Sequence, residues 1–183
     1  LLLRSLNQAR NLVASFKQIA VDQTSEVSRP LALGQYVREV VASLGPLYRR
    51  TPHRVAVEVR ADPRVTTFAG AISQLCTNLL QNALVHAFPE GQVGTVTLWV
   101  DRADGDLLEL GCRDDGTGMA PEVLRRVFEP FFTTTRGRGG SGLGLHIVHN
   151  LVHDLLRGTI AAESAPGRGT SFTIHFPAAP GDA

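Results

Sequence analysis

Residues 136–145 read Arg-Gly-Arg-Gly-Gly-Ser-Gly-Leu-Gly-Leu, and five glycines in ten positions are typical of a loop rather than of a helix or strand. The pattern predicts a mobile basic loop that runs directly into a helix over residues 142–156. Glycines let the backbone approach an anion, and the first-turn N–H groups and helix dipole attract phosphate oxygens. The loop is therefore a candidate phosphate-binding site, although a flexible surface turn would use the same residues.

The chain around this loop alternates between strand and helix patterns. Apolar and polar residues alternate over 55–59, and a long helical pattern covers 71–87. Further strands are expected at 95–100, 107–112, 159–163 and 170–176, with turns at 101–106 and 166–169. This order of elements predicts an α/β (α+β) fold.

The N-terminal residues 1–28 contain neither Gly nor Pro and predict one long helix. Its apolar or small residues recur at alternating steps of four and three, the heptad spacing of a helix that packs on other helices. They are Leu2, Leu6, Ala9, Val13, Phe16 and Ala20. No capping residue precedes the pattern, so we expect further chain upstream. The alternative is an amphipathic helix packed on its own domain.

Two prolines mark the boundaries of the next helix. Arg29-Pro30 is expected to end the N-terminal helix, and a helical pattern resumes over 33–44 until Gly45-Pro46.

Composition excludes several classes of protein. With 183 residues, 43% of them hydrophobic, and a net charge of +1, the chain is expected to be a soluble cytoplasmic domain with one extra element. No apolar run reaches the roughly 18 residues of a membrane span. Cys76 and Cys112 lack metal-ligand spacing and are expected to be buried, reduced thiols. Lys17 is the only lysine and the arginines are scattered, which argues against nucleic-acid binding.

The helix predicted over 71–87 carries a polar stripe of Gln74, Asn78, Asn82 and His86 at successive steps of four residues. The rest of the helix is mostly apolar, so a stripe of carboxamides suggests a lined pocket. A carboxamide can offer an oxygen to magnesium and an N–H to a phosphate. A solvated face of a surface helix is the alternative.

Asp114-Asp115-Gly116-Thr117-Gly118 follows a predicted strand. A carboxylate at a strand end can accept a hydrogen bond from an exocyclic amine, and the glycines let a flat ring lie against the backbone. That chemistry suits adenine, whereas an ordinary Asp-Gly turn is the alternative. Gly167-Arg168-Gly169-Thr170 is a weaker motif that a hairpin turn would also explain.

These motifs stand in a fixed order, which carries more information than any one of them. Together with Phe128-Glu129-Pro130-Phe131-Phe132, they resemble the asparagine, glycine and phenylalanine boxes of bacterial sensor histidine kinases over residues 54–177. Residues 1–50 resemble the second helix of the dimerisation and phosphotransfer hairpin of that family and its linker.

The resemblance implies a Bergerat-type fold, a two-layer sandwich of a mixed sheet backed by helices, preceded by a long helix. The implied domains are a hairpin helix and linker at 1–50, an ATP-binding catalytic domain at 51–177 and a disordered tail at 178–183. ATP would lie between the asparagine helix and the loop at 133–141.

The resemblance also implies roles for individual residues. Asn82 would bind Mg²⁺, Asn78 would lie beside the phosphates and act in catalysis, and Asp114 would accept the adenine amine. His86 would lie beside the nucleotide, and the Thr170 hydroxyl would reach the adenine end. Further ATP-binding positions are Gly116, Gly118, Gly140, Ser141, Gly142, Leu143 and Gly144.

Two departures from the family pattern bear on the reaction. Val85 stands where the family often has Lys, so Arg136 or Arg138 is expected to provide the catalytic phosphate contact. Relatives that hydrolyse ATP carry Glu where this chain has Asn78, which favours phosphoryl transfer over hydrolysis. A non-catalytic nucleotide-sensing or scaffolding module is the alternative, and the heptad helix disfavours an anti-sigma-type serine kinase.

The phosphoacceptor is expected to lie outside this chain, because none of its six histidines falls in the heptad helix. His146, His149 and His153 are expected to be structural. The resemblance implies an intact homodimer, phosphorylated on another helix, that passes the phosphate to the receiver domain of a response regulator. Any membrane anchor would lie upstream.

Overall fold

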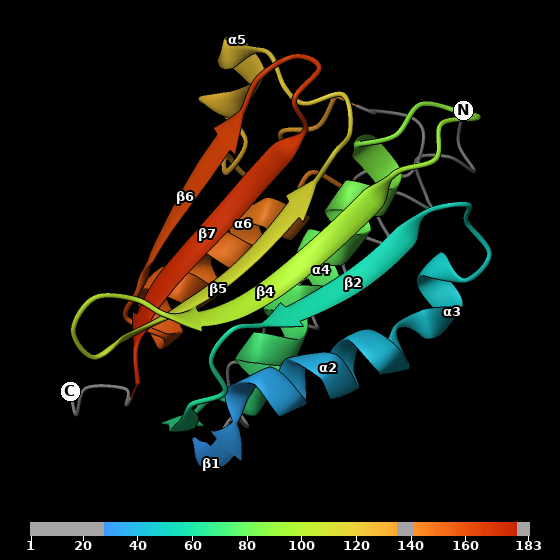
Figure 1. The fold of residues 1–183 in the computed structure, drawn as a ribbon. Helices are drawn as coiled ribbons and strands as arrows, with labels where there is room; N and C mark the ends of the chain where they lie inside the picture. The colour runs from blue at the N-terminus through green and yellow to red at the C-terminus, as the bar shows by residue number, and fades with distance from the viewer. Residues whose placement is uncertain (1–27, 135–140, 179–183) are drawn as a thin grey trace, which may run out of the picture.

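A mixed five-stranded sheet organises the chain in the computed structural model, which describes residues 28–134 and 141–178 (Figure 1). The strand order is β2-β4-β5-β7-β6, in which β2 and β4 are parallel and the other three pairings are antiparallel. The strands are β2 (Arg54–Val59), β4 (Thr95–Arg102), β5 (Leu107–Asp114), β6 (Thr159–Ser164) and β7 (Thr170–Pro177). All five follow the predicted positions closely.

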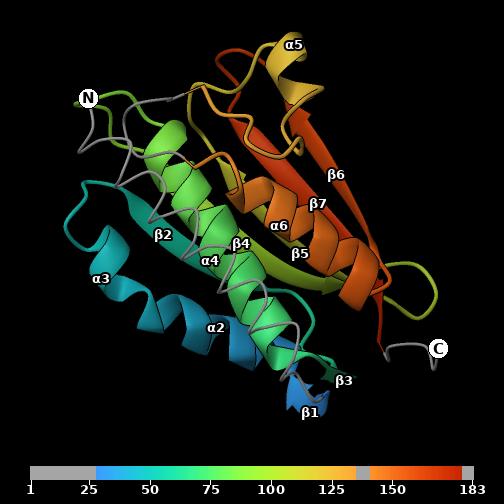
Figure 2. The ribbon, with the colours of Figure 1, turned by 180° about the vertical axis from the view of Figure 1, so that it is seen from behind.

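Helices cover one face of this sheet, as Figure 2 shows. They are α2 (Leu33–Ser43), α4 (Ala69–His86) and α6 (Gly144–Asn150), and α6 continues into the π-helix η1 (Leu151–Leu155). Two short helices, α3 (Gly45–Tyr48) and α5 (Pro121–Leu124), lie outside this layer. The predicted α/β two-layer arrangement is therefore confirmed.

The hydrophobic core lies between the sheet and the helices. Ile72, Leu75 and Leu79 of α4 are fully buried, and they share one core with Leu98 and Leu110 of the sheet. Each such side chain contributes roughly 1.5–3 kcal/mol of transfer free energy, so α4 is anchored along its whole length.

Both cysteines are free and buried in this core, as predicted. Burial raises the pKa of the Cys76 thiol to about 12, and it raises the pKa of Cys112 as well. Both groups are therefore uncharged thiols at neutral pH.

Residues 31–48, which precede the predicted domain boundary, belong to the same core. The helix predicted over 33–44 ends at Ser43, and Gly45-Pro46 opens α3 instead of a loop, because proline is well suited to the first turn of a helix. Leu33, Val37 and Val41 of α2 are buried, and α2 packs against α4.

A separate two-stranded ribbon forms from one strand before α2 and one strand after it. It pairs β1 (Arg29–Ala32) with β3 (Arg64–Thr67), and neither strand was predicted. Leu31 and Val65, which are partners in this ribbon, are both buried. The ribbon therefore ties residues 29–32 to the segment just before α4.

The face of the sheet opposite the helices carries Trp99. Its ring packs over Gly111 of the neighbouring strand, where an added Cβ would collide with the indole. Its Nε1–H donates to the Glu109 carboxylate, and His175 bonds the other oxygen of that carboxylate at 3.0 Å. The Arg113 guanidinium lies 5.9 Å from the ring centre.

Several predictions fall outside the described residues. They are the heptad helix over 1–27, the loop positions Arg136, Arg138 and Gly140, and the tail from residue 179 onward. Among the described helices, none combines the length and hydropathy that a membrane span requires.

Candidate functional site

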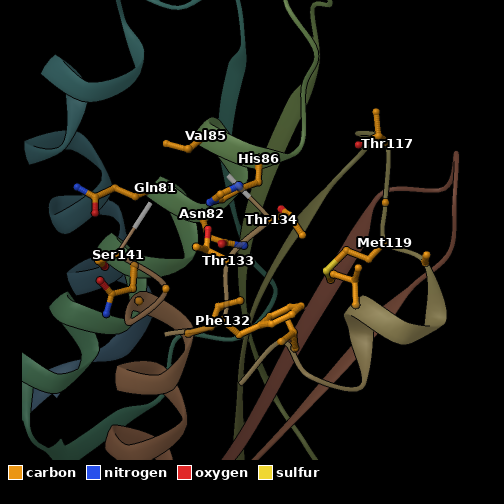
Figure 3. Close-up of a pocket in the computed structure, with 18 residues that line it drawn as sticks. Gln81, Asn82, Val85, His86, Thr117, Met119, Phe132, Thr133, Thr134 and Ser141 are labelled. Carbon is orange, nitrogen blue, oxygen red and sulfur yellow. The ribbon is translucent and has the colours of Figure 1, made fainter. Parts of the chain in front are cut away.

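A cavity of about 390 Å³ opens between the C-terminal half of α4, the loop after β5 and the segment that leads into α6 (Figure 3). This volume is within the usual range of small-molecule sites. The lining residues are Asn78, Gln81, Asn82, Val85, His86, Thr117, Gly118, Met119, Ala120, Val123, Val127, Phe132, Thr133, Thr134, Ser141, Gly142, Gly144 and Leu145.

Helix α4 brings three of the four residues of its polar stripe to the cavity. Asn78, Asn82 and His86 line the cavity, whereas Gln74 does not. Gln74 instead donates from Nε2 to Asn78 Oδ1 at 3.1 Å and so fixes the orientation of that carboxamide.

Asn78 is the least accessible polar group of the stripe. Its side chain is buried, and Nδ2 has no hydrogen-bond partner among the described residues. An unpaired buried donor costs roughly 1–3 kcal/mol. A ligand acceptor in the cavity would remove this cost, so the geometry favours an anionic or carbonyl-bearing ligand beside Asn78.

The C-terminal end of α4 combines an apolar rim with a neutral imidazole. Val85, which stands where the resembled family often has Lys, is 56% exposed. The described rim of the cavity therefore offers no lysine to a phosphate. Burial lowers the pKa of His86, which keeps its ring uncharged at neutral pH.

Asp114 terminates β5 beside the cavity without lining it. Its Oδ1 accepts the backbone N–H groups of Gly116 at 3.0 Å and of Thr170 at 3.2 Å. Burial raises the pKa of this carboxyl group, and the two backbone hydrogen bonds oppose that effect only in part. Both bonds involve Oδ1, so Oδ2 remains an acceptor for a ligand group.

The glycines of the site fall into two kinds. Gly118 and Gly142 have positive φ. A Cβ at Gly118 would collide with the backbone of Ala165, and a Cβ at Gly142 would collide with the backbone of Phe131. By contrast, a Cβ at Gly144 would meet no atom within 4 Å. Gly142 therefore fixes the shape of the segment, while Gly144 leaves open space where a ligand can approach the first turn of α6.

The hydroxyl of Ser164 joins the loop after β5 to the start of β7. It accepts the Met119 N–H at 2.8 Å, donates to the Gly169 carbonyl at 2.7 Å and lies 3.0 Å from Thr170 Oγ1. Because its one proton goes to Gly169, the Thr170 hydroxyl donates to Ser164 and keeps only acceptor capacity toward a ligand.

The structure thus brings most of the predicted residues to one region. Asn78, Asn82, His86, Gly118, Ser141, Gly142 and Gly144 line the cavity. Asp114, Gly116, Leu143 and Thr170 do not line it, while Arg136, Arg138 and Gly140 lie outside the described residues. Sequence reasoning assigned no role to Gln81 and Met119, although both adjoin its motifs, and no motif pointed to Ser164.

Comparison with known proteins agrees with this arrangement. Residues 69–180 match the family described as histidine kinase-, DNA gyrase B-, and HSP90-like ATPases. The chain is 34% identical to the sensor histidine kinase ZraS of Klebsiella oxytoca over 164 residues, which cover 90% of this chain and 32% of ZraS. It is 30% identical to the autoinducer 2 sensor kinase/phosphatase LuxQ of Vibrio harveyi over 178 residues, covering 91% of this chain and 20% of LuxQ.

Solved structures give the same result. The catalytic domain of the histidine kinase ThkA superposes with a TM-score of 0.71 at 27% identity, covering 84% of this chain and 97% of that one. Full-length ShkA in complex with AMPPNP gives a TM-score of 0.73 at 28% identity, covering 87% of this chain and 33% of that one. The chain spans about a third or less of the two curated relatives named above.

Proposed function

The chain belongs to the histidine kinase-, DNA gyrase B- and HSP90-like ATPases as the ATP-binding catalytic domain of a sensor histidine kinase. From this we infer that its cavity binds Mg-ATP. The γ-phosphate would pass to a histidine on a helix outside the described residues. The observation that carries the proposal is the composition of the cavity wall. The buried carboxamide of Asn78 and the half-buried one of Asn82 line the same cavity as Ser141, Gly142 and the open first turn at Gly144.

The adenine end of the nucleotide belongs at Asp114. Its free Oδ2 can accept the exocyclic amine. Gly116 lets the following loop lie close to Ala87 at the end of α4, and Gly118 lets it lie close to Ala165 in the turn between β6 and β7. The Thr170 hydroxyl, held by Ser164, offers an acceptor beside the same carboxylate. This pairing selects an amino-substituted purine over one with a carbonyl at that position, because a carbonyl would face the carboxylate oxygen.

Magnesium fits the donors of the phosphate end. Among residues 28–134 and 141–178 no group of three or more His, Cys, Asp or Glu could hold a metal, so a site made wholly of such side chains is not available there. Mg²⁺ accepts one or two protein oxygens and completes its shell with phosphate oxygens and water. We propose that Asn82 offers its Oδ1, with the carboxamide of Asn78 beside the phosphates. When bound, the ion would neutralise charge on the phosphate oxygens.

Among the described residues that line the cavity, His86 is the only one whose side chain could move a proton near neutral pH. None of them is a carboxylate that could activate water, and Asn78 occupies the position of the base in the hydrolysing relatives. We therefore propose slow hydrolysis, with Arg136 or Arg138 contacting the γ-phosphate during transfer.

The domain organisation of the intact protein is likewise a proposal. Because β1 and α2 share the core of the catalytic domain, we place the boundary near residue 28 instead of residue 50. The preceding residues would form the second helix of a dimerising hairpin, and a response-regulator receiver domain would accept the phosphate. A cytoplasmic location remains a prediction.

Calorimetry with ATP and Mg²⁺ tests nucleotide binding, and labelled ATP with a histidine-bearing hairpin supplied in trans tests transfer. We expect acid-labile phosphate on the hairpin, weak ATP hydrolysis and no label on the chain itself. Asn82→Ala should abolish the magnesium dependence of binding. The matched variant Thr77→Ala should not, because Thr77 lies on the same helix, bonds the Ser73 carbonyl and does not line the cavity.

Each outcome separates the proposal from its alternative. Nucleotide binding without transfer to any hairpin would favour a nucleotide-sensing module. Label on the isolated chain would place the acceptor within it, and magnesium dependence that persists in Asn82→Ala would assign the metal to another ligand.

A further inference from the structure

His149 and His153 place two imidazole rings side by side near the end of the α6–η1 segment. Their ring centroids are 4.6 Å apart, with an angle of 33° between the ring planes. His149 is half-buried and His153 is exposed, so solvent reaches the pair. Residues four apart on a helix lie on the same face, which places both rings on one surface.

The ring nitrogens of this pair differ in their hydrogen bonding from those of His146 and His175. Neither His149 nor His153 forms a hydrogen bond with the described part of the chain. His146 is engaged with the Phe128 carbonyl at 3.2 Å and with Asn150 at 3.3 Å, and His175 is engaged with Glu109 at 3.0 Å. The nitrogen lone pairs of His149 and His153 are therefore available to a ligand.

The backbone under the pair is firmly held. Val152 and Leu156 are buried, and the Leu156 N–H donates to the Leu151 carbonyl at 3.0 Å, which closes the wide turn of η1. The His149 ring also lies 5.7 Å from the Phe128 ring, which restricts its side-chain rotation. Two imidazoles on a fixed backbone lose little conformational entropy when they bind one ligand together.

We propose that His149 and His153 form a binding site for a divalent transition metal of the zinc, nickel or copper class. Imidazole nitrogen is a preferred ligand of these ions. The described residues contain no third histidine, cysteine or carboxylate grouped with the pair, so water completes the coordination shell. The site is therefore exchangeable and differs from the closed four-ligand arrangement of structural zinc.

This site is separate from the proposed magnesium site. Neither histidine lines the nucleotide cavity, and imidazoles compete poorly for Mg²⁺, which prefers oxygen ligands. The inference stands whether or not the cavity binds ATP.

Calorimetric titration of the whole chain with zinc chloride, without nucleotide and in excess Mg²⁺, tests the proposal. We expect one equivalent of zinc to bind the parent chain and this binding to be lost in His149→Ala and in His153→Ala. His175→Gln is the matched control, since it removes an imidazole from the opposite face of the sheet, and it should bind zinc as the parent does.

Thermal unfolding provides a second measurement, because an ion that binds only the folded chain raises Tm. Zinc should raise the Tm of the parent and not that of His153→Ala, which alters an exposed side chain and should fold normally. Zinc affinity retained in His153→Ala would overturn the proposal. Loss of binding in His146→Gln together with retention in His153→Ala would also overturn it, and would assign the metal to His146 and His149.

Discussion

Asp114 Oδ1 accepts the backbone N–H of Thr170 at 3.2 Å, although 56 residues separate the two along the chain. The same residues are partners in the β5–β7 pairing, and the bond joins the end of one strand to the start of the other. Because Gly116 donates to the same oxygen, the backbone fixes the carboxylate and leaves its second oxygen to the ligand.

Asp114→Asn should preserve the fold and weaken ATP binding. The Asn Oδ1 can still accept both backbone N–H groups, whereas Nδ2 would place a donor against the adenine amine. We expect ATP affinity to fall roughly tenfold or more, with Tm unchanged or raised because a buried charge is removed. Calorimetry and thermal unfolding measure both effects. Asp115→Asn is the control, and unchanged ATP affinity in Asp114→Asn would assign adenine to another group.

The raised pKa of Asp114 also predicts a pH dependence. Burial favours the protonated form of the Asp114 carboxyl group in the folded chain. The contribution of this group to the free energy of unfolding is therefore fully present below its pKa in the unfolded chain, and it is lost as pH rises through its pKa in the folded chain. ATP binding should change in the opposite sense and weaken on acidification, because the adenine amine needs an ionised acceptor. Affinity measured at several pH values should show this loss in the parent chain and not in Asp114→Asn.

His86 predicts a loss of stability on mild acidification. Burial lowers its pKa in the folded chain from the ordinary value of 6.5, so the unfolded chain takes up a proton first. The stabilising contribution is present above the unfolded pKa and is lost as pH falls through the folded pKa. Chemical denaturation between about pH 7 and pH 5 should show a smaller loss in His86→Gln than in the parent. Equal losses would mean that His86 is not the group responsible.

Gly142→Ala and Gly144→Ala form a matched pair. At Gly142, with φ of +68°, a Cβ would lie 2.5 Å from the Phe131 carbonyl carbon, so the variant should lose more than about 1 kcal/mol of unfolding free energy. Gly144→Ala should fold at least as well as the parent, because Ala favours the helix and the space is open. If the phosphates approach this turn, Gly144→Ala should still bind ATP more weakly. Denaturation and calorimetry separate the two effects.

Asn78→Ala should reduce nucleotide binding with little change in stability. The variant loses the Gln74 bond, but it also removes a buried Nδ2 that has no partner among the described residues. We expect a change within about 1 kcal/mol in unfolding free energy and a clear loss of Mg-ATP affinity. A large loss of stability with normal ATP affinity would show that Asn78 is structural.

Long helices and strands could be located from the sequence, whereas the shortest strands could not. Helix α4 and the strands β4 and β5 repeat their pattern over eight or more residues, and their positions were predicted closely. Strands β1 and β3 have four residues each, too few for a period to emerge, and their pairing depends on contacts distant in sequence. The predicted helix over 142–156 begins at Gly144, because positive φ at Gly142 excludes it from the helix, and it turns into a π-helix from Leu151.

The site was predictable where its chemistry requires a particular residue type. Asn78 and Asn82, four residues apart on one helix, and the glycines Gly118 and Gly142 in their motifs leave a pattern, and all four line the cavity. Ser164 left none, since its role depends on the meeting of the Met119 and Gly169 backbones in three dimensions. The resemblance identified Asp114, while only the structure shows which of its oxygens is already engaged.

Trp99 is the only tryptophan of the 183-residue chain, and it is fixed against Gly111 and Glu109 on the sheet face away from the cavity. The fluorescence of Trp99 should therefore change when the sheet unfolds and remain nearly constant when a ligand binds in the cavity. Trp99 is thus an intrinsic fluorescent probe of folding, so one sample can be titrated with nucleotide and then unfolded without an added dye. A variant that loses ligand affinity can thus be separated from one that has lost its structure in a single cuvette.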